Sequence, residues 1–200
     1  MTSDSEARPA RQRRVSARGQ ETRELILETA LEVIGRRGYG ATSLREIADA
    51  VGVTQAGMLH HFGTKEALLV EVLRQRDIAN RRALDAQPGD EPTPVRVARH
   101  NANAPALMHL YVSLQAAAST PGHPAHDFFR ARQERVHDLV VTDVRARQAA
   151  GEVRADLDPD RVATVLLALS DGLQAQLGAD PDIDIAATIE WLWAQFTVAP

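Results

Sequence analysis

The stretch from Ala41 to Leu69, ATSLREIADAVGVTQAGMLHHFGTKEALL, decides the fold of this 200-residue chain. Ser43 and Glu46 stand in the capping-box arrangement, in which a hydroxyl and a carboxylate satisfy the free backbone N–H groups that open a helix. A helix is therefore predicted to begin at Leu44. Gly52 stands where a left-handed residue ends a helix at the lowest cost.

A second helix follows after only a few residues, with Thr54 as its predicted N-cap and Gly63 at its end. Because the connection is so short, the two helices are expected to cross steeply, as in a helix-turn-helix. Amide, small and imidazole side chains occupy the exposed positions of the second helix, where Glu and Lys are usual. Thr64 then caps a third helix that begins at Lys65.

The side chains around this turn are suited to reading double-stranded DNA. Gln55 can pair bidentately with adenine, Arg45 with guanine, and Ala56 can contact a thymine methyl group. Gly57 would let the backbone come close to DNA. Each of these is more often an ordinary surface residue when taken singly, but together on a capped helix-turn-helix they favour DNA binding. The candidate DNA-binding residues are Thr42, Ser43, Arg45, Thr54, Gln55, Ala56, Gly57, Leu59, His60, His61 and Lys65.

Lys65 is the only lysine among the 23 basic residues of the chain. It falls in the first turn of a predicted helix, where the helix dipole disfavours a cation. A cation beside free backbone N–H groups is well placed to hold a phosphate. The alternative is a solvated lysine at this position.

The segment over residues 21–70 resembles the DNA-binding domain of the TetR family of bacterial transcriptional regulators, because cap, turn, short reading helix, HHF and TKEAL occur in register. The resemblance implies an all-α fold, with a three-helix helix-turn-helix head joined to a larger helical effector-binding and dimerisation body. It implies three regions: a disordered basic arm over 1–20, the DNA-binding domain over 21–66, and the ligand-binding and dimerisation domain over 67–200.

The resemblance also implies a function and roles for single residues. The expected function is a homodimeric repressor of a palindromic operator, released by a small-molecule effector. His60 is expected to contact phosphate, and His61 to pack or contact phosphate. Family members commonly carry tyrosine where this chain has Leu59, so contact with a thymine methyl group is expected there in place of a phosphate contact.

Composition narrows the class of protein. The chain is 44% hydrophobic, enough for a sizeable core, and it contains no cysteine, so disulfides and thiolate chemistry are excluded. No apolar run approaches the ~20 residues that cross a membrane, so we expect a soluble, cytoplasmic protein with no membrane partner. Residues 1–82 carry a net charge of +3 and residues 83–200 one of −7, which fits a protein that presents one end to DNA.

Residues 1–20 contain five arginines and almost no large apolar side chain, and they are predicted to be disordered. Such an arm either follows the minor groove or the phosphates, or is a solvated tail. The first helix is expected over Glu21–Arg37. A later helix is expected from Lys65 to about Ala83, with Arg74, Arg76, Arg81 and Arg82 on its outer side.

The last two predicted helices indicate a homodimer. In the first, Val162, Leu166, Leu169, Leu173 and Leu177 form one apolar stripe, with a second stripe beside it. A helix that is apolar on two sides needs two partners. A four-helix contact across a two-fold axis, two helices from each subunit, would supply them.

An effector site is predicted in the body, lined by Met108, Tyr111, Phe128, Phe129 and Gln174, for a largely apolar ligand. The alternative for each is simple core packing. No nucleophile-base-orienter set, phosphate loop or carboxylate pair is recognisable, so neither enzyme activity nor a cofactor is expected.

Two rival functions remain open. One is a constitutive helix-turn-helix DNA-binding or architectural factor without a ligand. The other is a metalloenzyme in which His123 and His126, with Asp127, hold zinc, although HPAH lies in a proline-containing loop. His60 and His61 cannot easily share one ion, because adjacent helical positions point about 100° apart. No metal is therefore expected.

Overall fold

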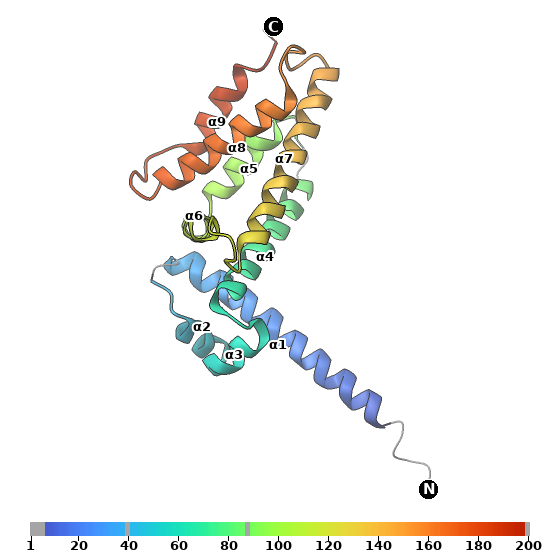
Figure 1. The fold of residues 1–200 in the computed structure, drawn as a ribbon, viewed down its shortest axis with the longest axis vertical. Helices are drawn as coiled ribbons and strands as arrows, with labels where there is room; N and C mark the ends of the chain where they lie inside the picture. Colours follow the sequence, from blue (N-terminus) through green and yellow to red (C-terminus); the bar gives the residue numbers. More distant parts are fainter. Residues whose placement is uncertain (1–6, 39–40, 87–88, 199–200) are drawn as a thin grey trace. The chain divides into compact units, whose positions relative to one another are not determined.

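The computed structural model describes residues 7–38, 41–86 and 89–198, with side chains described from residue 18 onward. Over these residues the chain forms nine α-helices and no β-strand (Figure 1), which confirms the all-α prediction. Two compact units can be distinguished, Met1–Gln75 and Arg76–Pro200. Their boundary lies inside α4, Lys65–Ala86, later than the expected division between residues 66 and 67.

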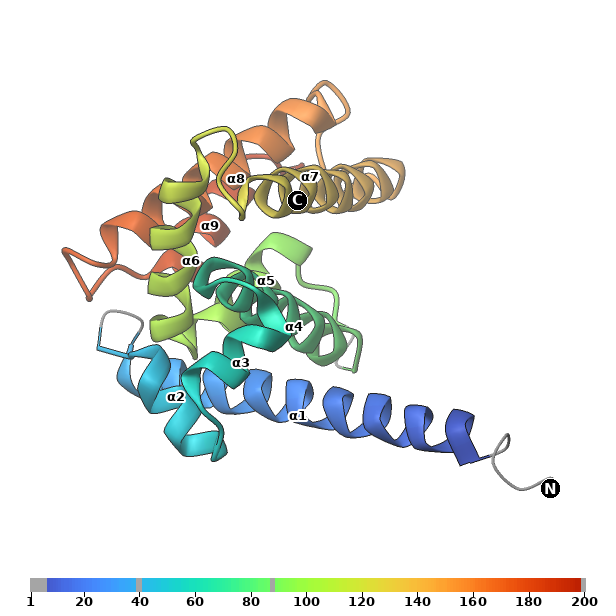
Figure 2. The ribbon, with the colours of Figure 1, turned by 60° about the horizontal axis from the view of Figure 1, so that its bottom comes forward.

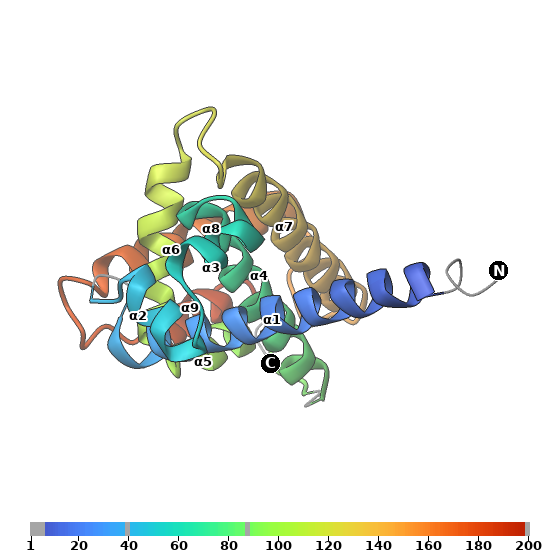
Figure 3. The same ribbon diagram turned by 90° about the horizontal axis from the view of Figure 1, so that it is seen from below.

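The first unit contains α1 (Ala7–Arg37), α2 (Leu44–Val51), α3 (Gln55–Phe62) and the beginning of α4. Helices α1, α2 and α3 pack against one another in pairs (Figure 3). Their apolar positions recur at helical spacing, so each helix turns one face inward. The buried side chains of this unit include Ile26, Ala30, Ile34, Ile47, Ala48, Met58, Leu68 and Val72.

Helix α1 begins earlier than the sequence analysis predicted. It starts at Ala7, so residues 7–20 are helical and the expectation of a disordered arm is wrong for them; residues 1–6 lie outside the described residues. Ala, Arg and Gln are good helix formers, and extending an existing helix avoids the cost of nucleating a new one. Low hydrophobicity alone therefore did not exclude helix here.

The second unit contains the rest of α4, then α5 (Thr93–Ala102), α6 (Pro105–Ala118), α7 (His126–Ala149), α8 (Pro159–Gln176) and α9 (Ile185–Ala194). Helix α7 packs against α8 and α5 against α9, while α8 also contacts α6 and α9 (Figure 2). Prolines lie in the first turns of α5, α6 and α8, where a missing N–H costs nothing. The core includes Val140, Val144, Ala163, Leu166, Ile189 and Trp193.

Several large apolar side chains of this unit stay exposed, among them Leu139 of α7, Val165 of α8 and Trp191 of α9. Among the described residues, no helix combines the length and apolar character that crossing a membrane requires.

Candidate functional site

The cap of α2 has the predicted capping-box geometry. The Glu46 N–H donates to Ser43 Oγ at 3.2 Å, and the Ser43 N–H donates to Glu46 Oε2 at 2.9 Å. The Ser43 backbone and hydroxyl bonds, with help from Arg37, hold the pKa of Glu46 below its ordinary value. Gly52 ends the helix at φ 79°, a left-handed conformation that favours glycine. Both ends of α2 are thus fixed by local hydrogen bonds.

Helix α3 is fixed in the same way and exposes one face. The Gly57 N–H donates to Thr54 Oγ1 at 2.9 Å. On the inner side Met58 is fully buried, while Gln55, Ala56 and His60 are exposed. The short helix therefore anchors itself through one thioether and presents an amide, a methyl group and an imidazole outward.

Gly57 has a structural role besides the predicted close backbone approach. A Cβ atom at this position would lie 3.1 Å from Thr54 Oγ1, tighter than an ordinary van der Waals contact. Glycine therefore leaves room for the capping hydroxyl.

Among the other predicted DNA-binding residues, Arg45 is exposed to solvent, whereas Thr42, Ser43 and Thr54 use their hydroxyl groups in hydrogen bonds with the backbone. Arg45 is 83% exposed, with only a long contact of 3.7 Å between its Nε and Asp49 Oδ2. Ser43 and Thr54 hold the caps, and Thr42 Oγ1 donates to the Gly38 carbonyl at 2.8 Å. We conclude that Thr42, Ser43 and Thr54 position the helices in this structure.

The remaining members of the set surround the end of α3. Leu59 and His61 are half-buried, and the ring centroids of His60 and His61 lie 6.2 Å apart with planes at 66°. Lys65 is half-buried in the first turn of α4, which Thr64 caps through Oγ1 at 3.0 Å from the Ala67 nitrogen. The two imidazoles do not share an orientation.

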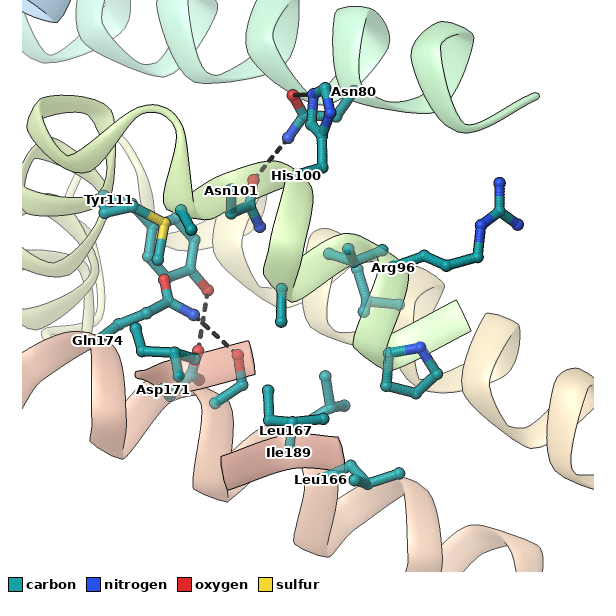
Figure 4. A pocket seen from close by; sticks show the side chains of 18 of the residues that line it. Asn80, Arg96, His100, Asn101, Tyr111, Leu166, Leu167, Asp171, Gln174 and Ile189 are labelled. Carbon is teal, nitrogen blue, oxygen red and sulfur yellow. Dashed lines mark hydrogen bonds between the residues drawn. The ribbon is translucent and has the colours of Figure 1, made fainter. Parts of the chain in front are cut away.

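The second unit contains a cavity of about 750 Å³ lined by residues of all its helices (Figure 4). Three of the predicted effector residues, Met108, Tyr111 and Gln174, contribute to its lining. Phe128 and Phe129 do not. The Phe129 ring packs 5.3 Å from that of Tyr111 and 5.1 Å from that of Phe128, so Phe129 adjoins a residue of the lining, and a role of the two rings in effector binding stays a prediction.

A polar cluster at one end of the cavity was not predicted. Arg76, expected on the outer side of α4, is only 4% exposed and donates from NH2 to Asn101 Oδ1 at 2.8 Å. Asn80 Nδ2 donates to the same oxygen at 2.8 Å, and His100 Nε2 lies 3.1 Å from Asn80 Oδ1. Burial lowers the pKa of Arg76 to about 10. The charged residue on the inner face of α4 was mistaken for a surface residue.

A second cluster joins four helices in the wall of the cavity. Arg132 of α7 donates from Nε and NH2 to the Asp77 carboxylate of α4, at 2.8 and 3.3 Å, and from NH1 to the Tyr111 hydroxyl at 3.1 Å. Tyr111 in turn donates to Asp171 of α8 at 3.4 Å, and Gln115 does so at 3.0 Å. Burial raises the pKa of Tyr111 to about 12. These bonds fix the positions of α4, α6, α7 and α8 around the cavity.

The histidines considered for zinc serve local structure instead. His123 Nδ1 accepts from the Ala125 N–H at 3.1 Å, and His126 Nδ1 lies 2.9 Å from the Ala118 carbonyl oxygen. In the part of the chain that the structure describes, no three His, Cys, Asp or Glu side chains are grouped to hold a metal ion.

Family comparison divides the chain much as the structure does. Residues 26–72 match the family described as bacterial regulatory proteins of the tetR family, and residues 100–196 match the C-terminal part of BetI-type transcriptional repressors. Both matches cover helices that carry the features described above.

Relatives that match over most of the chain agree with this family. The transcriptional repressor KstR2 of Mycolicibacterium smegmatis is 28% identical over 148 residues, covering 70% of this chain and 71% of KstR2. The transcriptional regulator TtgR of Pseudomonas putida is 26% identical over 89% of this chain and 90% of its own. A transcriptional regulator of Saccharomonospora viridis, crystallised with choline, superimposes with a TM-score of 0.70 at 26% identity, over 90% of this chain and all of that one.

Proposed function

Because this chain belongs to the TetR family of bacterial transcriptional regulators, we propose that it is a homodimeric repressor that binds a palindromic operator in the bacterial cytoplasm and leaves it when a small molecule binds. The chain is a regulator, and its relatives are regulators rather than enzymes. The observation that carries the proposal is α3, whose exposed face presents Gln55, Ala56 and His60 above a buried Met58.

Base reading is assigned to side chains that the caps leave free. Gln55 bonds an adenine edge and Arg45 a guanine edge, while Ala56 and Leu59 meet thymine methyl groups. His60 and Lys65 bind phosphates and set the register on the duplex. Because the net charge of the head is small, affinity depends on these few contacts more than on bulk charge.

We assign the homodimer interface to α8 and α9. Trp191 is 66% exposed and Val165 47%, and Leu173 and Leu192 are only partly buried. These helices thus carry more apolar surface than one subunit covers, and a two-fold axis would bury it on both copies at once. A charge introduced at Leu173 or Leu192 is expected to yield monomers, or unfolded protein if the packing of these side chains against the subunit's own core dominates, and sedimentation with circular dichroism distinguishes the two. A wild type that sediments as a monomer at micromolar concentration would contradict the palindrome model.

A regulatory ligand is assigned to the cavity of the second unit. Its volume of about 750 Å³ lies within the range of small-molecule sites, about 300–1,000 Å³. The cavity favours a ligand-released repressor over the ligand-free rival. The solved relative from Saccharomonospora viridis binds choline, which supports a small-molecule site in such a body.

Selection of genomic DNA fragments by the purified full-length protein tests the function directly. Recovered sites should contain inverted half-sites one helical turn or a multiple apart. Recovery of sites without two-fold symmetry would contradict a dimer that reads a palindrome.

Salt titration of the selected site then separates phosphate contacts from base contacts. Lys65→Ala should weaken binding to all sequences alike and reduce the salt slope by about one unit, since one phosphate contact is lost. An unchanged slope would show that Lys65 does not bind phosphate.

A further inference from the structure

Arg76 is an incompletely satisfied cation in the cavity wall. It is only 4% exposed, and its NH2 donates to Asn101 Oδ1 at 2.8 Å and lies 3.2 Å from Met108 Sδ. Its Nε is buried and has no hydrogen-bond partner among the described residues. A buried charge is costly unless it is paired and fully hydrogen-bonded, so the Nε donor of this guanidinium still needs an acceptor.

The neighbouring carboxylate cannot fill this role. Asp77 accepts hydrogen bonds from two nitrogens of Arg132, Nε and NH2. Arg135 NH2 also lies near this carboxylate, 3.7 Å from Asp77 Oδ2. Burial first, and repulsion by Arg132 second, lower the pKa of Arg76 to about 10. Because this value is still well above neutrality, Arg76 remains a cation, and among the described residues no ion pair includes it.

The rest of the cavity combines a polar end with an apolar wall. Figure 4 shows Asn80, His100 and Asn101 at one end, and Leu166, Leu167 and Ile189 across from them. A ligand that fills this space needs a polar head for the first group and an apolar portion for the second.

We propose that the cavity takes an amphipathic carboxylic acid, whose carboxylate binds Arg76 and whose apolar portion lies against the wall of α8 and α9. The inference rests on the proposed function, because it takes this cavity as the effector site. A carboxylate oxygen matches the unfilled Nε donor, since a hydrogen bond between two charged groups is roughly twice as strong as one between neutral groups. The NH2 group of Arg76 keeps its contacts with Asn101 and Met108.

The same geometry disfavours a cationic ligand such as the choline of the solved relative. Arg76 and Arg132 both contribute to the lining and repel a cation. The lining also contains carboxylates that would attract a cation, namely Asp77, Asp85, Asp171, Asp182 and Asp184. Asp77 is paired with Arg132, and Asp171 accepts hydrogen bonds from Tyr111 and Gln115. Asp184 Oδ1 accepts from the Ala187 N–H at the start of α9. The sequence predicts a largely apolar effector, and the proposal adds a carboxylate group to that ligand.

Calorimetric titration of the full-length protein with octanoate, decanoate and phenylbutyrate tests the proposal. The matching primary amides and choline serve as comparison probes. We expect the acids to bind the wild type more tightly than their amides, and Arg76→Met to reduce acid affinity by roughly tenfold to a hundredfold. Arg82→Met, which removes an exposed arginine of the same helix outside the cavity lining, should leave acid affinity unchanged.

Arg76→Met is expected to fold, because methionine has no charge to leave unpaired. Arg76→Lys keeps the charge but loses the Nε–H donor, and should retain part of the affinity. Equal binding of acids and amides, tighter binding of choline, no binding of any acid, or acid affinity untouched by both variants would each overturn the proposal.

Operator binding is measured separately on the same proteins. If an acid binds through Arg76 and weakens operator binding, both the ligand class and the proposed function are supported. If an acid binds through Arg76 without affecting the operator, the ligand class stands and release by a ligand is refuted.

Discussion

Two arginines, one from each unit of this chain, lie in opposite environments. Arg45 in the first unit is 83% exposed and pairs only loosely with Asp49, whereas Arg76 in the second is 4% exposed and has an unfilled donor. An exposed guanidinium is solvated until it meets a partner, so its presence costs the fold little. A buried one has already lost its water and requires a counter-charge. The two proposed roles follow this difference: an exposed guanidinium is available to operator DNA, and a buried one to the carboxylate of a small ligand.

Breaking the buried ion pair should give the largest effect on stability. Asp77→Asn leaves Arg132 without its carboxylate partner. This is costly because both side chains are mostly buried, with Asp77 22% and Arg132 18% exposed. We expect a loss of about 3 kcal/mol in the free energy of unfolding, at the lower end of the range for buried pairs because some solvent still screens them. Urea unfolding measures it.

The exposed pair of the first unit provides the matched control. Asp49→Asn removes the same carboxylate from Arg45, and we expect less than about 1 kcal/mol. Similar losses for the two variants would show that burial does not distinguish the pairs.

The sequence was sufficient for the first unit because its signals are local. Ser43 caps a nitrogen three residues away, and Gly52 needs only its own backbone angle, so residue type and spacing determined both ends of α2. The predictions of the caps and of the all-α fold, which the structure confirms, rested on such short-range rules. The start of α1 was missed because its charged residues form helix without an apolar stripe.

The cavity could be predicted only in part because its charges contact residues far away in the chain. Arg76 follows Val72 by four residues and thus continues the inner face of α4, but its charge suggested the surface. Its partner Asn101 lies on α5, which no spacing rule indicates. Phe128 and Phe129 are aromatic and Phe129 adjoins Tyr111, yet neither ring contributes to the lining, and their residue types could not show this.

Exposed reading residues should affect binding without affecting stability. Gln55→Ala or Arg45→Ala should each reduce operator affinity by about 1–3 kcal/mol and relax preference at one base position, because a bidentate base contact is lost. Binding titrations on operators substituted one base pair at a time locate that position. Equal losses on every sequence would assign the residue to phosphate instead, and a lowered unfolding free energy would place it in the fold.

The close approach of Thr54 to Gly57 should appear as a coupling energy of about 1 kcal/mol between the substitutions Gly57→Ala and Thr54→Ala. Alanine improves helix propensity by about 1 kcal/mol, but here its Cβ meets the Thr54 hydroxyl at 3.1 Å. Gly57→Ala should therefore give little or no gain in wild type and a clear gain in a Thr54→Ala background, read from a double-mutant cycle of unfolding free energies.

Gly35 in α1 supplies the matched control for this cycle, because nothing lies within 4 Å of the Cβ that it would gain. Gly35→Ala should stabilise the protein whether or not Thr54 is present. If Gly57→Ala raised the free energy of unfolding equally in both backgrounds, the Thr54 hydroxyl would have moved away from the new Cβ atom at no cost in stability.

The smallest effect is expected at Glu46, whose carboxylate accepts the Ser43 N–H on the exposed edge of the first unit. Its pKa is lower in the folded protein than its ordinary value of 4.5, because the Ser43 bonds favour the ionised form. That contribution is fully present above the unfolded value and is lost as the pH falls through the folded pKa. Glu46→Gln cannot titrate, so the stability difference between wild type and variant should shrink as the pH falls from 7 to about 3. Glu28→Gln, an exposed acid of α1, controls for the loss of a negative charge. A difference for Glu46→Gln that is constant with pH would show that the cap depends on an oxygen acceptor alone, and that ionisation of Glu46 does not stabilise α2.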